Sequence, residues 1–218
     1  MHFWSNDKDN FRFDPLTQEL EQKIVDMWNP KKIIFEPALT FDVPGLSPDP
    51  RFPHPINNML SMFYSIEKSN NLKSEYEQEN DFKYDCVIRL RTDEFFVEDE
   101  ESLNKFKKYQ RFSVNGLHQN PIPVGSFNQY DMDFMNVMDF YIHTDYGIHD
   151  HFAFGSSEVM DKYSNVYSNF IENIYMGAAV NPECILGFNV QVRQGVPSKR
   201  HQWTHFMYRD AKVALGLE

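Results

Sequence analysis

Two arginines and an aspartate alternate at the end of an apolar stretch, in the segment YDCVIRLRTD at residues 84–93. The apolar run predicts a strand, and alternation along a strand places Arg89, Arg91 and Asp93 on one face. Guanidinium groups bind phosphate oxygens, and a carboxylate is a ligand for Mg²⁺ or Mn²⁺. The pattern therefore indicates either a site for a diphosphate and its metal ion, or an ion-pair cluster that braces the edge of a sheet.

A second polar cluster precedes the apolar segment FAFG at residues 152–155. Asp150 comes just before this predicted strand, where a carboxylate can bind sugar hydroxyls or take a proton from an acceptor hydroxyl. The same stretch also holds side chains of the types that bind metal ions, namely His143, Asp145, His149, Asp150 and His151. Their spacing matches no specific metal motif, so both roles stay open.

A third candidate is Glu183, which follows Asn181 and Pro182 in the first turn of a predicted helix. An acidic residue there either carries chemistry or only complements the helix dipole. The chain has no Gly-x-Gly-x-x-Gly pattern, no phosphate-binding Walker loop and no nucleophile elbow around a serine. These absences argue against the common types of kinase, dehydrogenase and hydrolase.

Helical and strand patterns alternate along the chain and must position these side chains. Helices are predicted over residues 15–28, 56–79, 157–170 and 182–194, and strands over residues 32–36, 84–91, 111–114 and 152–155. Six prolines between residues 37 and 55 predict a long loop, of a kind that is usually functional or mobile. The alternation predicts a single α/β domain over residues 1–218, a three-layer α/β/α sandwich with a mainly parallel central sheet.

The composition narrows the classes of partner. With 21 Lys and Arg against 32 Asp and Glu, the net charge is −11. Proteins that bind a nucleic-acid backbone or an anionic membrane surface usually carry a net positive charge. We therefore expect no nucleic-acid partner. No apolar stretch is long enough for a transmembrane segment, and the first residues do not resemble a signal peptide, so we expect a cytoplasmic protein. Cys86 and Cys184 are expected to be core residues and not to form a disulfide.

Four segments together resemble a family of GT-A-like glycosyltransferases found in bacterial surface-polysaccharide loci and in large viruses. They are NPKKIIFE at residues 29–36, MFYSI at 62–66, YDCVIRLRTD at 84–93 and DHFAFGS at 150–156. The third is similar to the family pattern YDxVIRxRxD and the fourth to DxFAxGS, with Pro182 and Glu183 downstream. The third segment stands in the place of the Asp-x-Asp metal motif and keeps its last acid.

This resemblance implies a GT-A fold and transfer of a sugar from a nucleotide-sugar donor to a glycan acceptor. Asp93 would bind Mn²⁺ or Mg²⁺ on the donor diphosphate, which Arg89 or Arg91 would steady. Asp150 would contact the sugar or the acceptor, and Glu183 would lie on the acceptor side. The reaction would be a displacement at the anomeric carbon, with the metal stabilising the departing nucleoside diphosphate.

The resemblance also implies that the chain starts inside the second strand of the family, so that the fold would be N-terminally incomplete and part of the nucleotide pocket missing. Two other functions stay open on the residues alone. One is a metal-dependent hydrolase that uses the His143–His151 cluster. The other is a carbohydrate-binding or protein-binding module without catalysis.

Overall fold

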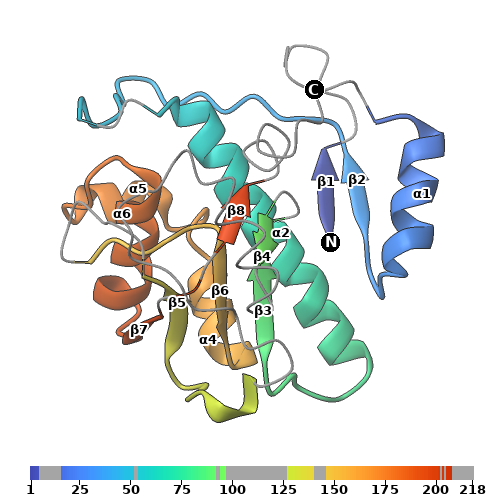
Figure 1. Cartoon of the computed structure of the whole chain (residues 1–218). Helices are drawn as coiled ribbons and strands as arrows, with labels where there is room; N and C mark the ends of the chain where they lie inside the picture. Colours follow the sequence, from blue (N-terminus) through green and yellow to red (C-terminus); the bar gives the residue numbers. More distant parts are fainter. Residues whose placement is uncertain are drawn as a thin grey trace, which may run out of the picture.

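The chain has a mixed α/β fold, seen in a computed structural model that describes residues 1–4, 16–51, 54–91, 94–96, 127–139, 146–201, 203 and 205–207 (Figure 1). Its helical segments are α1 (Gln18–Trp28), α2 (Ile56–Glu79), η1 (Phe127–Gln129), α4 (Ser157–Ser164), α5 (Phe170–Tyr175), α6 (Pro182–Gly187) and the π-helix η2 (Phe188–Arg193). Its strands are β1 (His2–Trp4), β2 (Ile34–Glu36), β3 (Val87–Leu90), β4 (Glu94–Phe96), β5 (Met135–Met138), β6 (Phe152–Gly155), β7 (Ser198–His201) and β8 (His205–Met207).

The described strands form three sheets. The largest has the order β3-β6-β5-β7, in which β6 runs antiparallel to both of its neighbours and β5 runs parallel to β7. A parallel pair, β1-β2, and an antiparallel pair, β4-β8, make up the other two. These pairings confirm an α/β fold with parallel and antiparallel strands, whereas the mainly parallel three-layer sandwich stays a prediction. Within the described residues β3 is an end strand of its sheet and not a central one, because it pairs with β6 alone.

The two faces of the large sheet carry separate apolar clusters, because successive side chains along a strand point to opposite faces. On one face Val137 and Ala153 join the main core beneath the helices α2 and α4, with Phe63 and Tyr163 buried between them. On the other face a smaller cluster consists of Met138, Phe152, Phe154 and Trp203. There the rings of Phe154, His201 and Trp203 stack, and His201 and Trp203 lie 4.4 Å apart between centroids.

The long helix α2 spans Ile56–Glu79, as its sequence pattern predicts. Its predicted apolar stripe is buried in the main core: Met59, Leu60, Phe63 and Ile66. Figure 1 shows α2 running between the β1-β2 pair and the large sheet. Among the described helices none is both long and apolar enough to cross a lipid bilayer.

Glu77, near the end of α2, is hydrogen-bonded to the segment that leads into β3. Its side chain is buried and accepts hydrogen bonds from Lys83 Nζ at 2.8 Å and from the Tyr84 amide at 3.0 Å. Lys73 Nζ lies 3.3 Å from the same carboxylate. Burial alone would raise the pKa of Glu77, but these partners lower it to about 2. The strand that carries Arg89 is thereby tied to α2 by a buried charge.

Two helix predictions need correction. The first helix begins at Gln18 with Thr17 as its cap, and not at residues 14–15, since the Thr17 hydroxyl accepts a hydrogen bond from the Leu20 amide. The helix predicted over residues 157–170 is broken between Ser164 and Phe170. Around this break a network of asparagine side chains links the two helical segments to Asn189.

Asn189 on η2 is the centre of that network. Its amide group donates to the Lys162 carbonyl and to the Asn165 side chain, each at 3.0 Å. Its side-chain oxygen accepts hydrogen bonds from Asn169 and Asn173. All four hydrogen-bonding positions of this buried amide are therefore satisfied, and α4, α5 and η2 are held together at one point.

Residues 37–51, 54 and 55 have no regular secondary structure, in agreement with the predicted proline-rich loop. The loop is attached to the body of the protein at several places. Phe41, Val43 and Leu46 pack against the main core, and the Asp49 amide donates to the Val180 carbonyl at 3.0 Å. This stretch therefore lies beside the segment that enters α6.

Candidate functional site

The short segment that leads into β6 carries Asp150 and is held in place from both sides. The Ile148 amide donates to the Glu183 carbonyl at 3.1 Å, and Arg200 donates to the Gly147 carbonyl at 2.8 Å. Beyond Asp150, the carbonyl of His151 accepts a hydrogen bond of 3.2 Å from the Arg91 amide. Asp150 is thus presented by a backbone that is fixed to β3, β7 and α6.

A close backbone contact sets how near α6 approaches this segment. A Cβ atom added at Gly187 would lie 1.9 Å from the Tyr146 carbonyl oxygen and 3.0 Å from Gly147 Cα. Only glycine leaves room for this approach. The first turn of α6 begins at Pro182 and is capped by Asn181, whose side chain accepts a hydrogen bond from the Cys184 amide at 3.3 Å. The cap and the glycine together bring Glu183 to the Asp150 segment.

Asp150 and Glu183 are close enough for their charges to interact. Asp150 is only 6% exposed, and Glu183 is partly buried. Burial raises the pKa of Glu183 and the charge of Asp150 raises it further, while the backbone hydrogen bond of Glu183, His54 and His151 act in the opposite direction. A pair of neighbouring carboxyl groups is suited to acid–base chemistry when the pKa of one of them is raised, as it is for Glu183.

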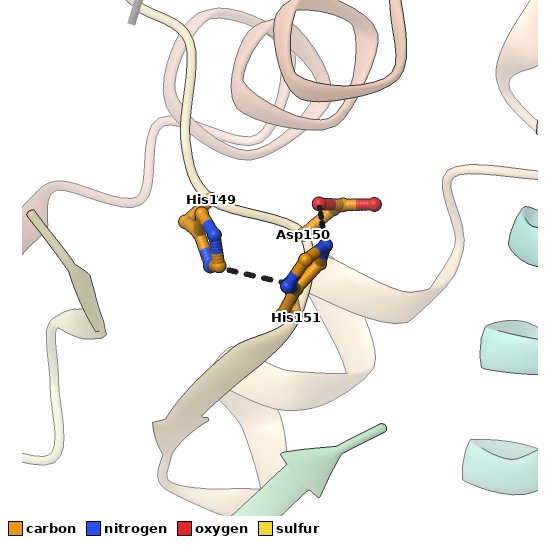
Figure 2. Close-up of side chains that lie close together, drawn as sticks. All are labelled: His149, Asp150 and His151. Carbon is orange, nitrogen blue, oxygen red and sulfur yellow. Dashed lines mark hydrogen bonds and ion pairs between the residues drawn. The ribbon is translucent and has the colours of Figure 1, made fainter. Parts of the chain in front are cut away.

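His149, Asp150 and His151 form a compact group of potential metal ligands (Figure 2). One ligand atom from each lies within 4.8 Å of the others. The His151 ring lies between the other two side chains, with its Nε2 atom 3.4 Å from Asp150 Oδ1, and the His151 amide donates to His149 Nδ1 at 3.4 Å. A mixed imidazole and carboxylate set suits a transition-metal ion better than Mg²⁺, which prefers oxygen ligands.

Arg89 approaches the same region from β3. It pairs with Ala153 of β6 and points to the sheet face that α4 covers, whereas Ile88 and Leu90 point to the other face. The charges of Arg89 and Asp150 both act on the pKa of the Tyr163 phenol on α4. Arg91 lies just beyond the strand, and its amide donates a hydrogen bond to the His151 carbonyl. Three separate segments therefore converge on Asp150.

The proline-rich loop contributes His54, an exposed residue whose charge acts on Glu183. Arg51 pairs with Asp49 at 2.6 Å, and this pairing and a backbone bond lower the pKa of Asp49 to about 2. The loop is thus one border of the region around Glu183.

The structure brings together four of the five site residues that the sequence predicts: Arg89, Arg91, Asp150 and Glu183. The fifth, Asp93, lies outside the described residues, as do His143 and Asp145. Sequence reasoning missed Tyr163, whose helical spacing marks it as a core residue and carries no sign of a polar role. A hollow of about 310 Å³ lies elsewhere, between β1, α2 and β3, and its lining includes none of these residues.

Comparisons with protein-family models, with curated proteins and with solved structures find no match for this chain.

Proposed function

We propose that the chain is a glycosyltransferase of the GT-A type, which moves a sugar from a nucleotide-sugar donor to a glycan acceptor. The observation that supports this most is that the main chain on either side of Asp150 is hydrogen-bonded to the main chain of Glu183 and of Arg91, so that three distant parts of the sequence meet. The resemblance to the glycosyltransferase family rests on the same three segments, and no pattern of local spacing requires them to meet.

In the proposed reaction the acceptor hydroxyl attacks the anomeric carbon of the donor sugar. A bond forms between the acceptor oxygen and this carbon, and the bond from the carbon to the phosphate oxygen breaks, with its electron pair leaving on the nucleoside diphosphate. The Asp150 carboxylate takes the proton of the acceptor hydroxyl. Glu183, whose pKa burial raises, forms a hydrogen bond with the acceptor.

A divalent metal ion would supply charge stabilisation of the leaving diphosphate. In this proposal Asp93 is its carboxylate ligand, and Arg91 steadies the diphosphate. Mn²⁺ and Mg²⁺ both stay candidates, because each is bound by carboxylate and phosphate oxygens. The three-layer GT-A sandwich and a cytoplasmic location belong to the same proposal.

The test is a donor assay with Mn²⁺ and a set of uridine and guanosine diphosphate sugars, following release of the nucleoside diphosphate. Water can serve as a slow acceptor, so the natural glycan is not needed. We expect Asp150→Asn to lower the rate by about 100-fold or more, as loss of a general base does. The matched control is Asp42→Asn, an exposed aspartate in the proline-rich loop. Equal rates for the two variants would contradict the role of Asp150.

One observation favours a second candidate, the metal-dependent hydrolase. His149, Asp150 and His151 already form a group within metal-binding reach, and such a centre could activate water. The two candidates differ in where the metal binds. The hydrolase requires that His149→Ala abolish Mn²⁺ or Zn²⁺ binding by the protein alone. The glycosyltransferase requires that Asp93→Ala, and not His149→Ala, remove the dependence of nucleoside diphosphate binding on Mn²⁺.

A further inference from the structure

Tyr163 and Arg89 each carry a buried polar atom near Asp150 that has no hydrogen-bond partner among the described residues. These atoms are the hydroxyl oxygen of Tyr163 and Nη1 of Arg89. Tyr163 is fully buried at 0% exposure, while Arg89 as a whole is only partly buried. An unsatisfied buried polar group costs about 1–3 kcal/mol, so native proteins keep few of them. Two such donors beside a candidate site call for a functional reason.

Both donors belong to elements that pack together on one face of the large sheet. Tyr163 faces the sheet from α4, and Arg89 faces α4 from β3 because of strand alternation. The β6 residue beside Arg89 is Ala153, whose side chain is a single methyl group. The phenol is subject to the charges of Arg89 and of Asp150, so the two donors and this carboxylate share one neighbourhood.

The protonation of Tyr163 favours a donor role. Burial raises the pKa of Tyr163 to about 12, with the Asp150 charge acting in the same direction and Arg89 against it. The hydroxyl therefore keeps its proton at neutral pH. An Arg–Tyr pair of donors that faces a carboxylate is poorly matched to an anionic oxygen, because Asp150 repels it. A hydroxyl group matches it well, since it can accept from the donors and give its own proton to the carboxylate.

We propose that Tyr163, Arg89 and Asp150 form a subsite for a hydroxyl group of the sugar carried by the donor, and that Tyr163 is a specificity-determining residue of this subsite. The proposal rests on the proposed glycosyltransferase function. Tyr163 and Arg89 donate to the sugar oxygen, and the hydroxyl proton points to Asp150. A sugar that lacks this hydroxyl, or has it in the opposite configuration, leaves both buried donors unpaired and binds more weakly.

The first test needs no ligand. Tyr163→Phe removes the hydroxyl and keeps the ring, so the thermal unfolding midpoint of the free protein should stay the same or rise by a few degrees. The control is Tyr146→Phe, because the Tyr146 hydroxyl accepts a hydrogen bond from the Ala179 amide at 3.4 Å. That variant should lower the midpoint. If Tyr163→Phe lowers the midpoint as much as the control does, its hydroxyl is already bonded and the proposal is overturned.

The second test separates the sugar from the nucleotide. Calorimetry with Mn²⁺ would compare UDP and GDP with UDP-glucose, UDP-galactose, UDP-N-acetylglucosamine and GDP-mannose. We expect the wild type to prefer one sugar nucleotide over its parent diphosphate. Tyr163→Phe should reduce this preference about 5-fold to 10-fold, the effect of one lost hydrogen bond, and leave affinity for the diphosphate unchanged. Tyr167→Phe, whose ring packs on Phe41 and Tyr64, is the binding control.

Each result has a separate meaning. If Tyr163→Phe weakens the diphosphate and the sugar nucleotide equally, the subsite does not bind sugar and the proposal is overturned. A sugar preference that Tyr163→Phe leaves intact overturns the subsite but not the glycosyltransferase function. If the wild type binds no diphosphate and no sugar nucleotide, both the glycosyltransferase function and the sugar subsite are overturned.

Discussion

The Ile148 amide donates a hydrogen bond of 3.1 Å to the carbonyl oxygen of Glu183. This bond joins the segment that carries Asp150 to the first turn of α6, so the spacing of the two carboxyl groups is set by main-chain atoms. Conservative substitutions of either side chain should leave that spacing intact. Variants at these two positions can therefore be interpreted as changes in chemistry and not in architecture.

The pH dependence of stability should change in Glu183→Gln. Burial and the Asp150 charge raise the pKa of Glu183 above its ordinary value of 4.5 in the folded state. Ionisation then favours the unfolded chain as the pH rises above 4.5, a penalty that glutamine does not have. We expect the variant to match the wild type at pH 4 and to be more stable at pH 7, measured by urea unfolding.

The control for this experiment is Glu158→Gln, on the exposed face of α4, where the glutamate pairs with Lys162. It should change stability by less than about 1 kcal/mol, since exposed ion pairs contribute little. A Glu183→Gln variant that becomes less stable than the wild type as the pH rises would contradict the raised pKa.

Glu77→Gln should destabilise the protein at neutral pH by about 1.5–3 kcal/mol, because it removes a buried carboxylate that accepts hydrogen bonds from Lys83 and the Tyr84 amide. The pKa of Glu77 is lowered to about 2, so its contribution is present above pH 4.5 and is lost as the pH falls toward 2. The difference between variant and wild type should therefore shrink in acid. Urea unfolding at pH 7 and pH 3 measures both effects.

Glu79→Gln on the same helix provides the comparison, because Glu79 is exposed and pairs with Lys32 at 2.6 Å. It should cost less than about 1 kcal/mol. Equal costs at positions 77 and 79 would show that the buried ion pair contributes no more than an exposed one.

Asn189→Leu should be much more harmful than its change in volume indicates. It removes four hydrogen bonds and leaves buried partners on α4 and α5 unsatisfied. At about 1–3 kcal/mol for each unsatisfied group, we expect a loss of at least 3 kcal/mol. Asn169→Ala, which removes one bond of the same network, should cost about 1 kcal/mol. A smaller loss for Asn189→Leu than for Asn169→Ala would refute the central position of Asn189.

Gly187→Ala should prevent α6 from reaching the Asp150 segment, because the new methyl group would lie 1.9 Å from the Tyr146 carbonyl oxygen. We expect a loss of several kcal/mol or failure to fold, measured by circular dichroism and thermal unfolding. Gly45→Ala is the comparison. The φ of Gly45, +79°, disfavours alanine, but a Cβ atom added there would have no other atom within 4 Å. That variant should lose only about 1 kcal/mol. Similar behaviour of the two variants would argue against the close contact.

The sequence predicts best what local chemistry decides. α2 is found where the apolar stripe after Pro55 predicts it, and Ser156 and Asn181 cap their helices as their side chains indicate. Local patterns place the start of the first helix too early, because Asp14 and Thr17 are both suitable caps and local rules do not decide between neighbouring candidates. The meeting of Asp150 with Glu183 was expected from the family resemblance and not from the pattern of either segment.

What local patterns could not predict depends on contacts between distant residues. Neither proline nor glycine marks the break after Ser164, where asparagine side chains form hydrogen bonds across three elements. Helical spacing places Tyr163 in the core but does not indicate that its hydroxyl has no hydrogen-bond partner in the part of the chain that the structure describes. The end position of β3 depends on strand pairing, which has no signature within the strand itself.

The ring stack on the far face of the sheet gives the protein a built-in optical signal. The chain has three tryptophans, and they lie in different surroundings: Trp4 stacks on Tyr64, Trp28 is 53% exposed, and Trp203 is buried on His201. A protonated imidazole in ring contact quenches indole fluorescence. Burial and the charge of Lys199 lower the pKa of His201, so the blue-shifted emission of Trp203 should stay bright at neutral pH and dim in acid. The part of the emission that changes with pH can thus report whether the sheet around Trp203 is folded, without any attached dye.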